Sequence, residues 1–78
     1  MKNVKKVNVW KLGHKSFIFI TPQKGKAEEV KDNLQEIADT VKAMEEYEEV
    51  FKNTGVSFVA VEEEGCIVDF KEGRLVNN

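Results

Sequence analysis

Residues 27–44 read AEEVKDNLQEIADTVKAM, and the spacing of their apolar members decides the fold. At about 100° per residue, apolar side chains at positions i, i+3, i+4 and i+7 gather in one stripe along a helix. The members of this stripe are Ala27, Val30, Leu34, Ile37, Ala38, Val41 and Met44. The periodicity therefore predicts an amphipathic helix over about residues 24–52, with its apolar side turned towards a core.

The end of this helix departs from the stripe. Tyr47 and Phe51 fall about half a turn away from the other apolar residues, so we expect the last two turns either to bend or to extend past the sheet towards another chain. After them, Asn53, Thr54 and Gly55 predict a left-handed helix cap.

Two strands are predicted before the helix. Residues 4–12 are rich in β-branched side chains, and Phe17-Ile18-Phe19-Ile20 is a short apolar run that Pro22 follows closely. Gly13-His14-Lys15 between them predicts a hairpin connection. Because residues 17–20 lack polar alternation, we expect this strand to lie at the centre of the sheet with both faces covered.

Two more strands are predicted after the helix, over residues 56–61 and 66–71, and Leu75 and Val76 would add a short fifth strand at the edge. The expected fold class is α+β in the order ββαββ, in one small domain covering residues 1–78. One long amphipathic helix would pack on a mainly antiparallel sheet of four or five strands, because this arrangement buries both apolar surfaces.

Residues with catalytic or metal-binding chemistry are scarce. His14 and Cys66 are each the sole member of their type. A structural zinc site needs about four ligands, so zinc is excluded, and we expect neither a cofactor nor an enzymatic activity. We interpret His14 as a turn residue and Cys66 as a buried small hydrophobe at the start of a strand.

The likeness of residues 21–26, TPQKGK, to a phosphate-binding loop is superficial, because the first Gly and the Ser or Thr after the Lys are missing. No apolar run approaches the roughly 18 residues needed to cross a bilayer. Lys2, Lys5 and Lys6 are not followed by an apolar core, so no signal peptide is expected. A single cysteine fits a reducing compartment, and the cytoplasm is the predicted location.

The net charge of −2 conceals a strong asymmetry along the chain. Residues 1–26 contain seven lysines and no acid, whereas residues 27–78 contain all 14 acids against five basic residues, a formal charge of −9. Such an asymmetry indicates an electrostatic partner, although solubility alone also explains many charged residues.

The outer side of the predicted helix concentrates the acids. Glu28, Asp32, Glu36, Asp39 and Glu46 project from one side of an ideal helix, and Glu62, Glu63 and Glu64 form a second group in a predicted turn. Like charges at i, i+4 weaken a helix, and this cost suggests that the acids are used. The simpler interpretation is a solvated helix face and a polar turn.

The favoured hypothesis makes these eight acids a partner-binding surface. A row of carboxylates can occupy the lysines and arginines that another protein uses to hold DNA. The expected protein is then a non-enzymatic DNA mimic that inhibits a basic nucleic-acid-binding protein, for example a nucleoid-associated protein, without binding DNA itself. In size and acidity the chain resembles small phage-encoded inhibitors of host nucleic-acid-binding proteins, although no diagnostic motif carries this resemblance.

Two other hypotheses use different features. In the first, Lys2, Lys5, Lys6, Lys11 and Lys15 with Trp10, Phe17 and Phe19 form a small nucleic-acid-binding module, although seven lysines without arginine supply no bidentate base reader. In the second, the oppositely charged halves guide self-association. A homodimer is also favoured by the short chain, by Tyr47 and Phe51, and by Trp10 near a sheet end.

Overall fold

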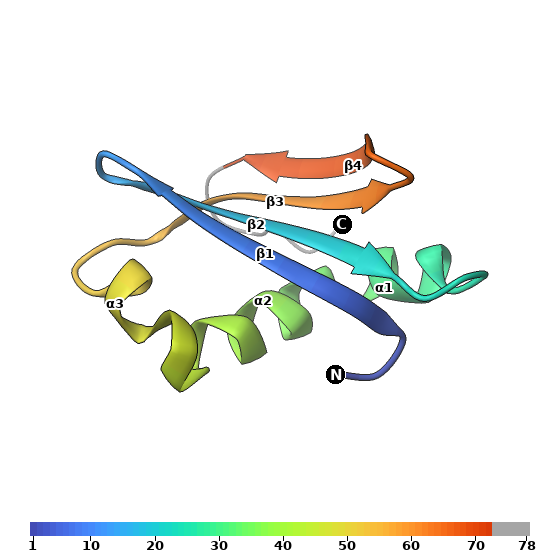
Figure 1. Cartoon of the computed structure of the whole chain (residues 1–78), viewed down its shortest axis with the longest axis horizontal. Helices are drawn as coiled ribbons and strands as arrows, with labels where there is room; N and C mark the ends of the chain where they lie inside the picture. The colour runs from blue at the N-terminus through green and yellow to red at the C-terminus, as the bar shows by residue number, and fades with distance from the viewer. Residues whose placement is uncertain (73–78) are drawn as a thin grey trace.

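A computed structural model describes residues 1–72, and the predicted fifth strand at Leu75 and Val76 lies outside the described residues. Eight elements follow one another along the chain, as Figure 1 shows. They are β1 Val4–Leu12, β2 Lys15–Pro22, α1 Ala27–Asp32, α2 Leu34–Lys42, the 3-10 helix η1 Glu45–Tyr47, α3 Glu48–Phe51, β3 Val56–Glu63 and β4 Cys66–Glu72. The α+β class and the ββαββ order are confirmed.

The four strands form one sheet in the order β1-β2-β3-β4. β1 pairs with β2 and β3 pairs with β4 in antiparallel fashion, whereas β2 and β3 run parallel. Parallel neighbours need a long crossover, which the helical segment supplies. The sheet is therefore mainly antiparallel, and β2 is central, as the sequence predicts.

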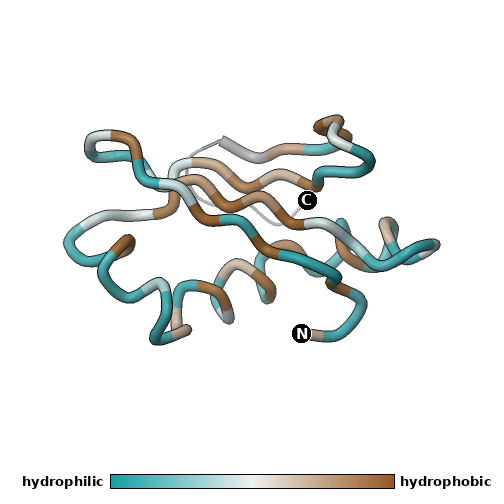
Figure 2. Tube along the Cα trace, in the orientation of Figure 1, coloured by the Kyte–Doolittle hydropathy of each residue, from teal (hydrophilic) through white to brown (hydrophobic). Residues whose placement is uncertain are grey.

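The helices cover only one face of the sheet, so the fold has two layers (Figure 1). The core lies between them. From the sheet it takes Ile18, Ile20, Val59 and Val61, all with no exposed surface. In Figure 2 the two central strands carry the most continuous hydrophobic colour. The buried helical residues are those of the predicted stripe, namely Val30, Leu34, Ile37, Ala38 and Val41.

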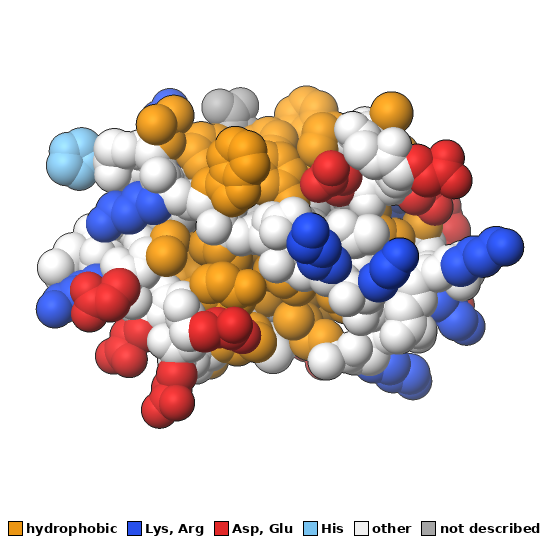
Figure 3. Space-filling model, viewed as in Figure 1, with side chains coloured by type: hydrophobic (Ala, Val, Ile, Leu, Met, Phe, Trp, Pro, Cys, Tyr) orange, Lys and Arg blue, Asp and Glu red, His pale blue; other side chains and the backbone are white. Residues whose placement is uncertain are grey.

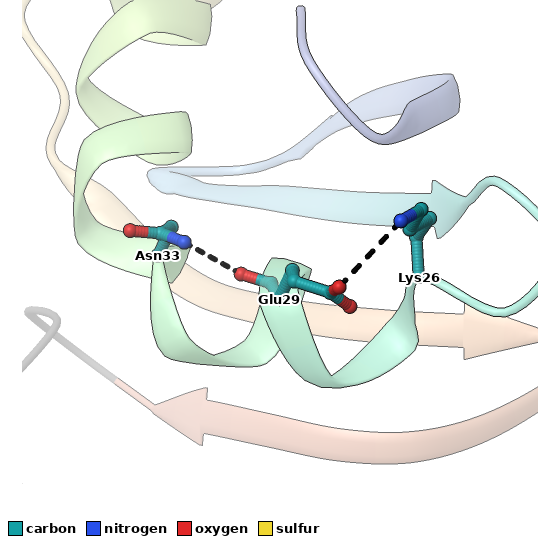
Figure 4. A network of polar contacts seen from close by, with 3 residues as sticks. All are labelled: Lys26, Glu29 and Asn33. Carbon is teal, nitrogen blue, oxygen red and sulfur yellow. Dashed lines mark hydrogen bonds and ion pairs between the residues drawn. The ribbon is translucent and has the colours of Figure 1, made fainter.

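The helical segment is not one long helix, in contrast to the sequence expectation. Asn33 interrupts it with φ −117° and ψ 22°. Its side-chain Nδ2 donates a hydrogen bond of 2.7 Å to the carbonyl oxygen of Glu29, as Figure 4 shows. An asparagine that binds the backbone in this way competes with the helical ladder, so α1 ends here and α2 begins.

A second break after α2 settles the position of Tyr47 and Phe51. Met44 is extended, with ψ 132°, and the chain continues as η1 and α3 in a new direction. Phe51 is thereby buried in the core, and the Tyr47 hydroxyl donates to the carbonyl oxygen of Val7 at 3.4 Å. The bend is the alternative that the structure supports. These two residues pack inside their own chain, so they no longer argue for a dimer.

A buried hydroxyl pair that the sequence did not indicate ties the helical segment to the sheet. Ser16 is fully buried, and its Oγ lies 3.0 Å from Thr54 Oγ1 and 3.4 Å from the carbonyl oxygen of Val50. Thr54 Oγ1 donates to the same carbonyl oxygen at 3.0 Å. Next to Thr54, Asn53 has φ +60°, so the predicted left-handed residue is present. It does not cap α3, because Lys52 before it is extended, with φ −61° and ψ 120°, and Asn53 belongs to a turn closed by the Thr54 amide and the Phe51 carbonyl oxygen at 3.1 Å.

Candidate functional surfaces

The first candidate surface is a shallow, open groove along the outer side of α2, which we call the acidic groove. Three of the predicted acids line it, namely Asp32, Glu36 and Asp39, and all three are exposed. They remain together although Asn33 interrupts the helix, because Asn33 also lines the groove and the chain resumes its helical course directly after it. Uncharged Gln35, Thr40, Ala43 and Met44 complete the lining.

The other predicted acids lie apart from this groove. Glu28 is on α1, and Glu46 is in η1 beyond the Met44 break. Glu62 and Glu63 are paired residues at the end of β3, so the prediction that they lie in a turn was wrong, and only Glu64 is in the β3–β4 turn. Glu64 adopts φ +53°, which fits a tight turn. The expected surface of eight acids is therefore divided among four places: the groove, α1, η1 and the end of β3 with the turn that follows it.

No lysine of the described residues makes an ion pair with the three carboxylates of the acidic groove, although Lys2 lines a neighbouring pocket together with Glu36. Among the described residues, the two ion pairs are Lys26–Glu29 at 3.7 Å and Lys31–Glu28 at 3.6 Å, both local to the start of the helical segment. Asp39 accepts a hydrogen bond of 3.0 Å from Gln35 Nε2, which holds its carboxylate at the groove without removing its charge. The negative potential at the groove remains available to a partner.

A second candidate surface lies on the sheet face that the helices leave open. It consists of Trp10, Phe17, Phe19, Phe58 and Phe70, and we call it the aromatic face. Its rings form a connected group, with centroid distances of 5.6 Å for Trp10–Phe19, 5.9 Å for both Phe17–Phe58 and Phe19–Phe58, and 5.4 Å for Phe58–Phe70.

The aromatic face contradicts the expectation that residues 17–20 are covered on both sides. Phe17 and Phe19 are only half-buried, and the outer rings of the group, Trp10 and Phe70, are 64% and 57% exposed. Sequence reasoning singled out Trp10, Phe17 and Phe19 but missed Phe58 and Phe70. The alternation of residues along β3 and β4 could have placed Phe58 and Phe70 on this face, but only once the register between the strands is known.

Lysines line the edge of the sheet next to this face. Lys5, Lys6 and Lys11 are exposed on β1, which is an edge strand. By register, Lys6 and Lys15 share the side of the sheet on which Trp10 and Phe17 lie. Lysines on an edge strand also discourage pairing with another sheet, so part of the basic charge has a purely structural explanation.

The two residues with nucleophilic or imidazole side chains lie far from any cluster. His14 is in the β1–β2 turn, as expected. Cys66 is exposed, so the prediction of a buried cysteine was wrong: it opens the edge strand β4, where it pairs only with Glu63. Within residues 1–72 no group of three or more His, Cys, Asp and Glu side chains could hold a metal ion.

The helices of residues 1–72 are too short or too polar to span a membrane. Comparison with protein-family models, curated proteins and solved structures finds no significant similarity. The fold and its surfaces therefore define the class of this protein as a small α+β protein with one acidic and one aromatic surface.

Proposed function

We propose that this protein is a non-enzymatic binding module whose acidic groove occupies the basic nucleic-acid-binding surface of another protein. The partner is a DNA-binding protein such as a nucleoid-associated protein. Occupying its lysines and arginines with carboxylates would inhibit DNA binding, as a DNA mimic does. The cytoplasm, where such a partner meets DNA, is the compartment in which the protein would act, and a phage-like inhibitor is the closest class.

The observation that carries the proposal is the lining of the acidic groove. Three carboxylates, those of Asp32, Glu36 and Asp39, are exposed side by side, and none of them makes an ion pair with a described residue. An isolated surface charge is strongly hydrated, but several carboxylates of one sign set a potential that steers and holds a basic surface. Glu36 and Asp39 lie three residues apart on α2, about 4.5 Å along its axis, a distance comparable to the spacing of about 3.4 Å between phosphates along one DNA strand.

The groove lies on the helical side of the molecule, opposite the aromatic face. The proposal therefore holds whether the protein acts as one copy or as two. Glu28 and Glu46 extend the negative potential along the helical segment, although Glu28 is partly offset by Lys31. The acids of the β3–β4 turn are not needed for this function.

The test is displacement of a fluorescent DNA duplex from purified nucleoid-associated proteins by the full chain. Wild-type protein should displace the duplex at low salt and lose this ability as salt rises, because screened carboxylates bind weakly. In a gel shift without a partner, neither single- nor double-stranded DNA should move with the protein.

The location of the surface is tested with two triple variants that change the net charge equally. Asp32→Lys, Glu36→Lys and Asp39→Lys together should abolish displacement. The control combines Glu45→Lys, Glu48→Lys and Glu49→Lys, which are exposed on η1 and α3 outside the groove, and it should retain most of the activity. Equal loss in both variants would show that only net charge matters, and failure of the wild type to displace DNA from any of these proteins would remove the proposal.

A further inference from the structure

The aromatic face is a large apolar surface without a cover in the described part of the chain. Besides Trp10 and Phe70, it is bordered by Leu12, 74% exposed, and by Ile67 and Val68, 47% and 43% exposed. The register places Leu12 two positions beyond Trp10, and Ile67 opposite Glu62 on the same side of the sheet. A fully buried aromatic side chain covers about 150–250 Å², so these exposed fractions and the half-buried Phe rings together amount to roughly 600 Å² of apolar surface.

This area matches what a stable dimer requires. A standard interface buries about 800 Å² on each partner, of which about 65% is apolar in homodimers. The aromatic face together with Leu12, Ile67 and Val68 supplies that apolar share. It also lies at the upper end of the roughly 300–600 Å² that the largest apolar patch of a monomer covers.

The charges around the face favour a second copy of this chain over a nucleic acid. The central positions Phe17, Phe19, Phe58 and Ala60 carry no charge, and within residues 1–70 the lysines at this face are Lys6 on β1 and Lys15 at the start of β2. The opposite border ends in the acids Glu62, Glu63 and Glu64, which would repel a polyanion lying across the four strands. Two copies of such a surface can pair with the basic border of each copy against the acidic border of the other.

Both borders lie at the same end of the sheet. Val4 pairs with Pro22, so the start of β1 lies beside the end of β2. Because β2 runs parallel to β3, the end of β3 and the acidic turn lie at that end too. Figure 3 agrees: basic side chains lie along β1 and acidic ones near the β3–β4 turn at the same end of the molecule, with hydrophobic side chains reaching the surface between the two ends.

This arrangement selects one of the two simple ways to stack two copies face to face. A two-fold axis parallel to the strands places β1 of each copy over β4 of the other and keeps the ends aligned. Lys6, which the register places on the side of the aromatic face, then lies over Glu62 and Glu64 at the end of the partner's β3 and in the turn that follows it. An axis across the strands would instead place β1 over β1, with lysines facing lysines, which is unfavourable.

We infer that the aromatic face is the contact surface for a second copy of this chain, stacked face to face about a two-fold axis parallel to the strands, with Lys6 of each copy against Glu62 and Glu64 of the other. Self-complementary surfaces of this kind form closed dimers. Trp10 is the principal anchor, because an exposed tryptophan buried at an interface is the residue type that most often dominates binding.

The first test measures the mass of the full chain by sedimentation equilibrium at low salt. Wild-type protein should be a dimer at micromolar concentrations. Trp10→Glu should weaken dimerisation by at least about 30-fold, the effect of one strong interface anchor, and it should leave the fold intact because Trp10 is mostly exposed. Ala43→Glu adds the same charge on the helical side, where the residue is also exposed, and should leave the dimer unchanged.

The second test determines how the two copies are oriented in the dimer. Among the described residues neither Lys6 nor Glu62 makes an ion pair within the chain, and the register places both on the side of the aromatic face. Lys6→Glu alone and Glu62→Lys alone should each weaken the dimer by roughly three- to tenfold, as expected for two symmetric surface pairs. The double variant should recover most of the wild-type affinity, because each exchanged pair is again of opposite sign.

Several results would overturn the inference. A monomer at about 100 μM, where even a weak dimer would associate, would remove it, as would a dimer whose affinity Trp10→Glu does not change. A wild-type chain that stays monomeric and binds a single-stranded oligonucleotide, with binding lost in Trp10→Glu, would assign the face to nucleic acid instead. A double variant no stronger than the single variants would refute the proposed axis.

Discussion

Replacing Phe51 with alanine should remove the anchor of the last helical turn. Phe51 is 7% exposed and belongs to the core, whereas α3 has only four residues. A helix of that length has no stability of its own, so its position depends on this side chain. The backbone amide of Thr54 donates to the Phe51 carbonyl oxygen at 3.1 Å, so the same anchor also orders the connection to β3.

The expected cost is large relative to the whole protein. A buried aromatic side chain of about 200 Å² contributes about 5 kcal/mol at 25 cal/mol per Å², and measured Phe→Ala changes in cores cost about 3–5 kcal/mol. A chain of this length has a total unfolding free energy of about 4–12 kcal/mol. Phe51→Ala should therefore leave the protein marginally folded, whereas Phe51→Leu should cost less than about 1.5 kcal/mol.

The assay is urea unfolding followed by far-UV circular dichroism, since the exposed Trp10 is a poor reporter of unfolding. Lys52→Ala, at the exposed neighbouring position, is the control and should change stability by no more than about 0.5 kcal/mol. Hydrogen exchange of the Thr54 amide should accelerate in Phe51→Ala. A cost below about 1 kcal/mol together with unchanged exchange would show that Phe51 does not hold α3 in place.

Three further predictions concern single side chains. Burial raises the pKa of Tyr47 above its usual value near 10, and Glu46 adds to the shift. The neutral phenol therefore stabilises the fold below about pH 10, and this stabilisation is lost as the pH rises through the pKa of the folded state. Over that pH range wild-type protein should lose more stability than Tyr47→Phe. Ser16→Ala should cost about 0.5–1.5 kcal/mol in urea unfolding, because Thr54 keeps its bond to Val50; a neutral effect would mean that the hydroxyl pair is incidental. Exposed Cys66 should react with a thiol reagent in the folded protein as fast as in urea, and protection would contradict its place on the edge strand.

The acids of the groove could be recognised from the sequence because their relation is local. Asp32, Glu36 and Asp39 lie within eight residues, and helical spacing alone puts them on one side. The same reasoning failed for the full set of eight acids. The break at Met44 separates Glu46 from the groove, and one extended residue is enough to cause such a break.

The sequence by itself determined the class of the fold, the central place of β2 and the core-facing stripe of Val30, Leu34 and Val41. The reason is that the spacing of apolar residues shows which side of a helix or strand is buried. Only the tertiary structure decided that β2 and β3 run parallel, that Cys66 is exposed, and that rings from four strands meet on an uncovered face. The apolar run at residues 17–20 is compatible with two covered faces or one. The tertiary arrangement decides between them, because within the described residues the helices all pack on one face of the sheet.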